Sequence, residues 1–268
     1  MGVIVDDLNL SIRQISAAWR VMCDAAPGRI IEVHDGIEYV FSGLPIPFFN
    51  IALLTGGGIS RPQLEARARE ACVFAGKMTV PWLFIVTQEA IEDEGETDGL
   101  LHACGLDPVM PLTGMVAEHV APSSAPAPGL ELVVPSDEAE YGTILDINSA
   151  AYDMDLAAGK PLLGVPSFWT PHFPVLGVVD GAAVATAAVL MVDGIRYVAL
   201  VATRPGHQRR GYADIVMRRA LEMSAAAHPG SSTVLHATEA GRPIYERMGY
   251  RTISRSTLYM EQRFLTGH

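Results

Sequence analysis

The chain has 268 residues, 49% of them hydrophobic and 18% charged, with a formal net charge of −11 at pH 7. This hydrophobic content supports one or two buried cores and excludes a disordered chain. The negative charge disfavours nucleic acid and anionic lipid surfaces as partners, because both would repel the protein.

No apolar run reaches the roughly 18 residues of a membrane-spanning helix, and the first residues lack the basic and apolar segments of a signal peptide. The cysteines Cys23, Cys72 and Cys104 are odd in number and have no metal-ligand spacing, which is typical of reduced thiols. We therefore expect a cytoplasmic protein without a membrane span, a disulfide or a metal. Abundant alanine, with arginine in place of almost all lysine, indicates a bacterial origin.

The first half of the chain alternates between helical and strand patterns. Helices are predicted at residues 9–23, 61–76 and 99–105. Strands are predicted at residues 29–33, 38–43, 49–56, 81–87 and 106–119.

A segment rich in proline and serine, VAPSSAPAPGLE at residues 120–131, divides the chain into halves of similar size. This composition suits an extended connector. We therefore predict a first domain at residues 1–120, a linker at 121–129 and a second domain at 130–268.

The second half opens with a strand and then a helix that runs to about residue 151. Asp137 and Glu140 have the spacing of a capping box, and Ser136 is an alternative N-cap. Two later strands each end in Asp-Gly, which is a hairpin signal. Strands are predicted at residues 130–134, 173–181, 183–194, 195–203, 232–238 and 250–260. Helices are predicted for about fifteen residues after 204–211 and at 241–249.

The two halves repeat one order of elements. LHACGLDPVMPLTGMV aligns without gaps with YERMGYRTISRSTLYM, so that Gly105 matches Gly249 and Leu101 matches Tyr245. This self-similarity indicates that one α/β unit was duplicated.

The segment RPGHQRRGYADIV, residues 204–216, lies between an apolar strand and a helix. Free backbone amides at a helix start carry the positive end of the helix dipole, and Gly211 would let a phosphate come close. Arg209 and Arg210 add positive charge beside them. The segment predicts a diphosphate site, and the alternative is a basic surface turn before an ordinary helix.

VALVATRPGHQRRGYADIVMRRAL resembles motif A of the GNAT superfamily of N-acetyltransferases, in which Q/R-x-x-G-x-G/A follows a strand; residues 208–213 fit this pattern. HATEAGRPIYERMGY resembles motif B, with residues 245–250 fitting Y-E-x-x-G-F/Y. Two motifs in order are more specific than one. The resemblance implies an α/β (α+β) class of fold, with tandem GNAT-like halves that each have a mixed, mostly antiparallel sheet flanked by helices.

The resemblance implies acetyl-CoA as cosubstrate. The amides of the turn would hold its pyrophosphate, and the preceding strand would offer backbone groups to the pantetheine arm where it splays from the next strand. The implied cofactor-binding residues are Val201, Thr203, Gln208, Arg209, Arg210, Gly211, Tyr212, Ala213 and Thr238. Thr238 departs from the family pattern, because many members have Asn at that position.

Tyr245 matches the tyrosine that acts as general acid toward the departing thiolate in many GNAT enzymes, and the alternative is a core tyrosine. His236 is a tentative general base because its pKa suits proton removal, although we favour a structural histidine there. Weaker candidates for the base are Asp153, Asp155, Asp193 and Glu239. Ordered water can also take the proton in this family.

The acceptor would be a small-molecule amine or a peptide amine. Residues 154–173 form a loop-rich stretch with several aromatic rings, and they would make either a lid over the acceptor or a plug over the core; we favour the lid. The rings belong to Phe168, Trp169, His172 and Phe173. Few acids cluster there, which disfavours a polycationic acceptor.

The segment GGGIS, residues 56–60, also places glycines between a strand and a helix. Ser60 and Gln63 have capping-box spacing, and Pro62 removes one amide donor. We therefore expect one cofactor site per chain, in the second half, and treat a second cradle as the alternative.

Together these patterns predict an acetyl-CoA-dependent N-acetyltransferase that acts on a primary amine by direct attack in a ternary complex. One alternative is a non-catalytic acyl-CoA-binding or regulatory protein. Another is an interaction protein whose first half docks a partner. An oligomer is compatible with the sequence.

Overall fold

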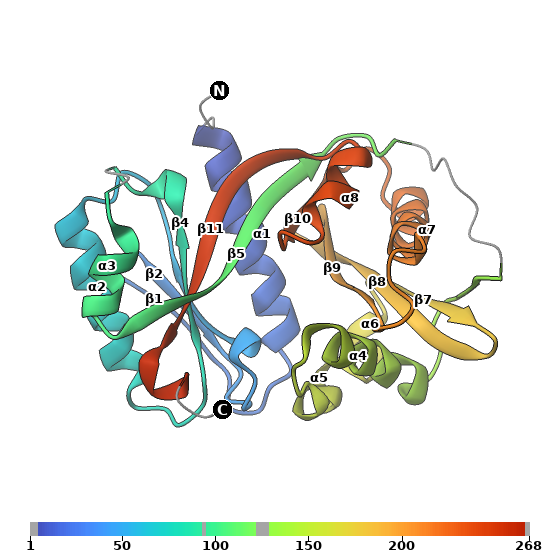
Figure 1. Ribbon diagram of the computed structural model, residues 1–268, viewed down its shortest axis with the longest axis horizontal. Helices are drawn as coiled ribbons and strands as arrows, with labels where there is room; N and C mark the ends of the chain where they lie inside the picture. The colour runs from blue at the N-terminus through green and yellow to red at the C-terminus, as the bar shows by residue number, and fades with distance from the viewer. Residues whose placement is uncertain (1–4, 93–94, 122–128, 266–268) are drawn as a thin grey trace. The chain divides into compact units, whose positions relative to one another are not determined.

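The computed structural model describes residues 5–92, 95–121 and 129–265 (Figure 1). The chain forms two compact units, and it crosses between them four times. Unit 1 contains Met1–Met115, His236–Pro243 and Arg251–His268, and unit 2 contains Val116–Leu235 and Ile244–Tyr250. Residues 122–128 of the expected linker lie outside the described part, so the boundary at 121–129 stays a prediction.

Unit 1 is built on a mixed sheet. Its strands are β1 (Ile30–His34), β2 (Ile37–Phe41), β3 (Asn50–Leu54), β4 (Leu83–Thr87), β5 (Leu106–Ala117) and β11 (Arg251–Glu261). They are hydrogen-bonded in the order β1-β2-β3-β4-β11-β5. The pair β3–β4 is parallel, whereas β1–β2, β2–β3 and β4–β11 are antiparallel.

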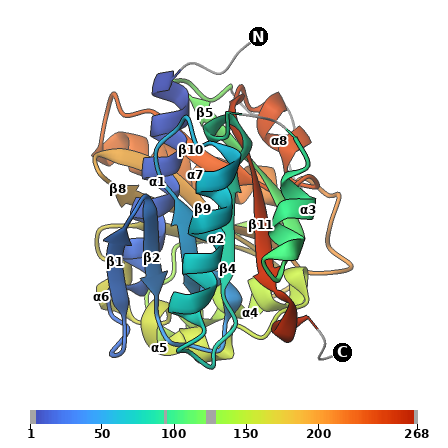
Figure 2. The same ribbon diagram turned by 90° about the vertical axis from the view of Figure 1, so that its left-hand side faces the viewer.

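Helices cover both faces of this sheet. They are α1 (Val5–Cys23), α2 (Arg61–Ala75) and α3 (Thr97–Ala103). In Figures 1 and 2, α2 and α3 lie on one face and α1 lies on the other. The helix α1 forms because Leu8, Ile12, Ile15 and Trp19 recur every three or four residues and all are buried.

The last strand of the chain, β11, completes unit 1. Ser256 pairs with Thr87 and Met260 with Leu83, and Figure 2 shows β11 beside β4. The hydroxyls of Thr87 and Ser256 lie 3.0 Å apart, and the Trp82 indole donates to Glu261 at 2.9 Å. The sequence predicts this strand but not its partner, because pairing depends on cross-strand contacts far apart in the chain.

Unit 2 is built on strands that are mostly antiparallel. Its strands are β6 (Glu131–Val133), β7 (Phe173–Val179), β8 (Ala182–Val192), β9 (Ile195–Thr203) and β10 (Thr233–Ala237), in the order β10-β9-β8-β7-β6. Only β9–β10 is parallel among these pairs of unit 2. The predicted Asp-Gly hairpins are confirmed, since Asp180-Gly181 and Asp193-Gly194 all have positive φ angles, as a tight hairpin turn requires.

Two helices, α4 (Glu138–Tyr152) and α7 (Tyr212–Ala227), pack against β7, β8 and β9, and in Figure 1 these strands run between α7 and α4. The short helix α8 (Arg242–Arg247) follows β10 in the chain. Asp137 is the N-cap of α4 and accepts from the Glu140 amide at 2.9 Å, so the predicted cap is confirmed. Ser136 instead donates its amide to the Glu140 carboxylate at 2.7 Å.

Residues 154–173 contain short helices rather than an open loop. These are η3 (Ala157–Gly159), α5 (Lys160–Leu163) and α6 (Pro166–Trp169). Trp169 is 2% exposed, stacks on Tyr141 and donates its indole N–H to the Leu163 carbonyl at 2.6 Å. His172 is also buried and accepts from the Met191 amide. The expected lid is therefore wrong for Trp169 and His172, which plug the core because their polar atoms find partners inside it.

The three cysteines carry free thiols. Cys23 is fully buried, whereas Cys72 and Cys104 are half-buried, so only the first is a core residue. Burial raises the pKa of the Cys23 thiol to about 12. In the part of the chain that the structure describes, no helix is long and apolar enough to cross a membrane.

Candidate functional site

The turn between β9 and α7 is anchored to the sheet at its first residue. The Arg204 amide donates to the Val184 carbonyl at 2.8 Å, and the Arg204 Nε donates to the Ala183 carbonyl at 3.0 Å. At its other end Gly211 is the N-cap of α7 in the left-handed conformation, with φ of 80°. The buried Tyr212 then fixes the first turn of α7 against the core.

Backbone amides gather where this turn meets α7. Arg209 and Gly211 both have positive φ, and residues 208–211 are exposed. The amides of residues 209–213 donate to no acceptor among the described residues. A Cβ placed on Gly211 would meet no atom within 4 Å, so the approach to these amides is open. This is the arrangement that binds an anion at a helix start.

The corresponding turn of unit 1 uses its amides internally. The Ser60 amide donates to Gln63 Oε1 at 2.9 Å, which confirms the predicted capping box before α2. The Ile59 amide donates to the Ala90 carbonyl, and Ile59 forms a parallel bridge with Ile91. These bonds tie the end of the glycine segment to the chain that follows β4 and use two of the backbone amides before α2.

The end of β9 departs from regular strand geometry. Leu200 has φ of 54°, and the register between β8 and β9 shifts between Thr186 and Ala188. The pairing with β10 covers Arg196–Val198 within unit 2. Beyond it, the Val201 carbonyl accepts from the Tyr152 hydroxyl at 3.0 Å, and the Thr203 carbonyl accepts from the Gln208 side chain at 3.3 Å.

Tyr245 lies on α8 and is 8% exposed. Burial raises the pKa of its phenol above the ordinary value of 10, and the neighbouring phenols of Tyr152 and Tyr250 raise it further. The rings of Tyr245 and Tyr250 meet edge to face, with centroids 6.1 Å apart. Its phenol therefore stays protonated, as a proton donor must, in a largely apolar setting.

His236 and Thr238 fall in unit 1. The His236 Nε2 lies 2.9 Å from the Ser11 hydroxyl, which in turn lies 2.6 Å from the Ser254 hydroxyl. Burial lowers the pKa of His236 to about 3. A neutral imidazole held by Ser11 is a weak base, and these contacts favour the structural alternative.

Thr238 supports the start of α8. Its carbonyl accepts from the amides of Gly241 and Arg242, and its hydroxyl accepts from the Gly241 amide at 3.3 Å. Thr238, which stands where many members of the family have Asn, thus accepts hydrogen bonds from backbone amides at the start of the helix that contains Tyr245.

Two side chains of α4 reach the same part of β9, and the sequence reasoning missed both. Asn148 donates to the Leu200 carbonyl at 3.4 Å, one residue before the carbonyl bound by Tyr152. Asn148 and Tyr152 are four residues apart and so share one helix face, which was the available signal.

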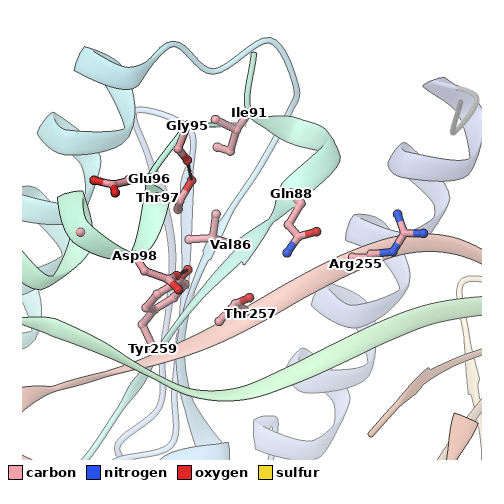
Figure 3. Close-up of a pocket in the computed structure, with 11 residues that line it drawn as sticks. Val86, Gln88, Ile91, Gly95, Glu96, Thr97, Asp98, Arg255, Thr257 and Tyr259 are labelled. Atoms are coloured by element: carbon pink, nitrogen blue, oxygen red, sulfur yellow. Dashed lines mark hydrogen bonds between the residues drawn. The ribbon is translucent and has the colours of Figure 1, made fainter. Parts of the chain in front are cut away.

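Unit 1 holds a separate cavity of 1040 Å³ between β4, α3 and β11 (Figure 3). Its lining includes Glu96 and Asp98, and Tyr259 donates its hydroxyl to Asp98 at 2.6 Å. Arg255, also in the lining, pairs with Glu89 at 3.4 Å. The lining contains no residue of the glycine segment 56–60, and its carboxylates would repel a diphosphate.

Among the residues that the structure describes, no group of three or more His, Cys, Asp or Glu side chains is placed to hold a metal ion.

Residues 180–253 match the family model of the acetyltransferase (GNAT) domain. The match includes the turn before α7 and Tyr245. This part of the chain is therefore a GNAT domain, as its two motifs predict. No curated protein matches the chain.

Solved structures of GNAT proteins resemble nearly the whole chain. A GCN5-related N-acetyltransferase from Kribbella flavida is 20% identical with a TM-score of 0.68, over 95% of this chain and 96% of that one. One from Sphaerobacter thermophilus is 13% identical with a TM-score of 0.57, over 97% and 94%. A tandem GNAT protein from the clavulanic acid biosynthesis pathway is 12% identical with a TM-score of 0.55, over 97% of each chain. These likenesses confirm the predicted tandem GNAT-like fold.

Proposed function

We propose that the protein is an acetyl-CoA-dependent N-acetyltransferase with one cofactor site per chain. The observation that carries the proposal is the set of free amides at residues 209–213, which follow β9 directly and open α7. Five adjacent donors at a helix start suit the charge and size of a diphosphate.

The residues of the turn fit the phosphates of acetyl-CoA. Arg209 and Arg210 would add charge beside the amides, and Gly211 leaves the approach open. The backbone of Val201 and Thr203 would guide the pantetheine arm along β9, while Gln208, Tyr212 and Ala213 shape the turn. Bound acetyl-CoA supplies a thioester whose carbonyl carbon is attacked by a neutral amine.

Tyr245 is proposed as the general acid. Its phenol donates a proton to the departing thiolate sulfur, and its raised pKa keeps that proton in place until the thiolate forms. Because the pKa of His236 is lowered and its ring is held by Ser11, we propose that water rather than His236 takes the proton from the amine.

The acceptor is proposed to be a primary amine on a small molecule or a peptide.

We also propose that the protein works in a bacterial cytoplasm, where thiols such as those of Cys72 and Cys104 stay reduced. Its net charge of −11 argues against nucleic acid and anionic membranes as partners.

Isothermal titration with acetyl-CoA tests the binding part of the proposal, and we expect one site per chain. Release of free thiol across a panel of amines, amino acids and peptides tests the catalytic part. Binding without thiol release from any acceptor would favour the non-catalytic acyl-CoA-binding alternative. Two sites per chain would contradict the proposal that only unit 2 binds the cofactor.

A further inference from the structure

The end of β9 presents one edge to β8 and the other away from it. Ala202 pairs with Thr186 of β8, and the Arg204 amide donates to Val184. Along a strand, alternate residues direct their amide and carbonyl groups to opposite edges. The carbonyls of Val201 and Thr203 therefore face away from β8.

Side chains, rather than solvent alone, cover these two carbonyls. The Tyr152 hydroxyl donates to the Val201 carbonyl at 3.0 Å, and the side-chain Nε2 of Gln208 donates to the Thr203 carbonyl at 3.3 Å. One donor comes from the end of α4 and the other from the turn before α7. The free edge of β9 is thus capped at both of the carbonyls that the proposed function gives to the pantetheine arm.

Tyr152 is held in a defined position. The next residue, Asp153, has φ of 52° and ends α4, while Asn148 joins the same helix to the Leu200 carbonyl. The side chain is 40% exposed, burial raises the pKa of its phenol, and its hydroxyl is fixed by the bond to the Val201 carbonyl of β9. Tyr152 also lies close enough to Tyr245 to raise the pKa of that phenol.

We propose that Tyr152 competes with the pantetheine arm of the acyl-CoA for the Val201 carbonyl, so that binding must displace its hydroxyl. This inference rests on the proposed function. It makes Tyr152 a positioning residue that sets cofactor affinity from the end of α4. Gln208 competes in the same way at Thr203, although it also belongs to the turn that binds the phosphates.

The test is the affinity for acetyl-CoA of Tyr152→Phe, measured by isothermal titration. Loss of one competing hydrogen bond should tighten Kd about three- to tenfold. Tyr141→Phe is the matched control, because it removes a phenol from the same helix whose ring stacks on Trp169. Its Kd should equal that of the wild type, and thermal unfolding would verify that both variants are folded.

The outcomes separate the two proposals. No binding by the wild type would overturn the proposed function and this inference together. Binding by the wild type, with an unchanged or weaker Kd for Tyr152→Phe, would overturn the inference alone. A weaker Kd would mean that Tyr152 contacts the bound cofactor instead of competing with it. A merely structural role would lower stability without tightening Kd.

Discussion

At the scale of single residues, unit 2 surrounds Tyr245 with other phenols. Tyr152 and Tyr250 both raise the pKa of Tyr245, and the Tyr250 hydroxyl lies 2.9 Å from that of Thr233. Burial keeps the Tyr245 proton in place, and the same burial is compatible with a core tyrosine. Only a change in turnover can separate the two roles.

Tyr245→Phe should lower kcat about 100-fold, because a positioned acid contributes on this order to proton transfer. The Kd for acetyl-CoA should stay unchanged, because the phenol acts on the thiolate as it leaves. Steady-state kinetics and isothermal titration on the same preparation measure both quantities.

Tyr250→Phe is the control, since it removes a neighbouring phenol that is bonded to Thr233 and should leave kcat near the wild-type value.

The Tyr245 phenol can donate a proton only while it is protonated, and its pKa lies above 10. Its ionisation should therefore not lower kcat/KM below pH 10. Wild-type turnover in Tyr245→Phe would remove this residue from the mechanism.

Two histidines give the fold a predictable response to acid. Burial lowers the pKa of His172 to about 4 and that of His236 to about 3, from 6.5. The unfolded chain binds a proton at each site below about pH 6.5, whereas the folded chain does not. The free energy of unfolding should therefore fall as pH drops from 6.5 toward 4, by about 1.4 kcal/mol per pH unit for each histidine.

Urea unfolding at pH 7, 6 and 5 measures this slope. His236→Gln should make this slope shallower by the contribution of one histidine, because glutamine stays neutral in both the folded and the unfolded chain. Glutamine can still face Ser11. A stability that is the same at pH 7 and pH 5 would show that these rings are not shielded from protonation.

At the scale of elements, the chain contains two glycine turns between a strand and a helix. Before α7 the amides of residues 209–213 donate to no acceptor among the described residues, whereas before α2 the amides of Ile59 and Ser60 donate to Ala90 and Gln63. The two turns differ in the hydrogen-bond acceptors that the chain offers to their backbone amides. They do not differ in glycine conformation, since both contain glycine at positive φ. This difference is the basis for expecting an anion at the turn before α7 and none at the turn before α2.

Gly211→Ala should weaken acetyl-CoA binding at least about tenfold, since any Cβ here intrudes on the approach of the phosphates and strains a φ of 80°. Gly58→Ala is the matched control. Its φ is 68°, and its added Cβ would make only an ordinary contact, 3.6 Å from Glu92. Each change should cost about 1 kcal/mol of stability, but only the first should alter Kd, as measured by titration.

Equal weakening by Gly58→Ala would indicate a second cofactor site in unit 1. No effect of Gly211→Ala on Kd would show that the turn before α7 does not hold the phosphates.

At the scale of the whole molecule, unit 1 depends on the end of the chain. The strand β11 pairs with β4 along five residues and buries Leu258 and Tyr259, far in sequence from the rest of the unit. Without β11, the edge of β4 that does not pair with β3 would be left unpaired. The halves of the sequence and the compact units are therefore different divisions of the chain.

A fragment of residues 1–120 should fail to fold as a monomer, because β4 would lose its partner β11 and expose an apolar edge. Size-exclusion chromatography and near-ultraviolet circular dichroism would show an aggregated or loosely packed fragment. The full chain under the same conditions is the control. A fragment that unfolds cooperatively as a monomer would show that the first half is an independent domain.

The sequence by itself determined the helices, the strands and the turn before α7, because apolar periodicity, capping residues and glycine act over a few neighbouring positions. It also pointed to Tyr245 through a local motif. Only the tertiary structure decided that β11 pairs with β4, that Trp169 plugs a core, and that Tyr152 caps the Val201 carbonyl. Each of these contacts joins residues distant in the chain, and its energy depends on burial and alignment that exist only after folding.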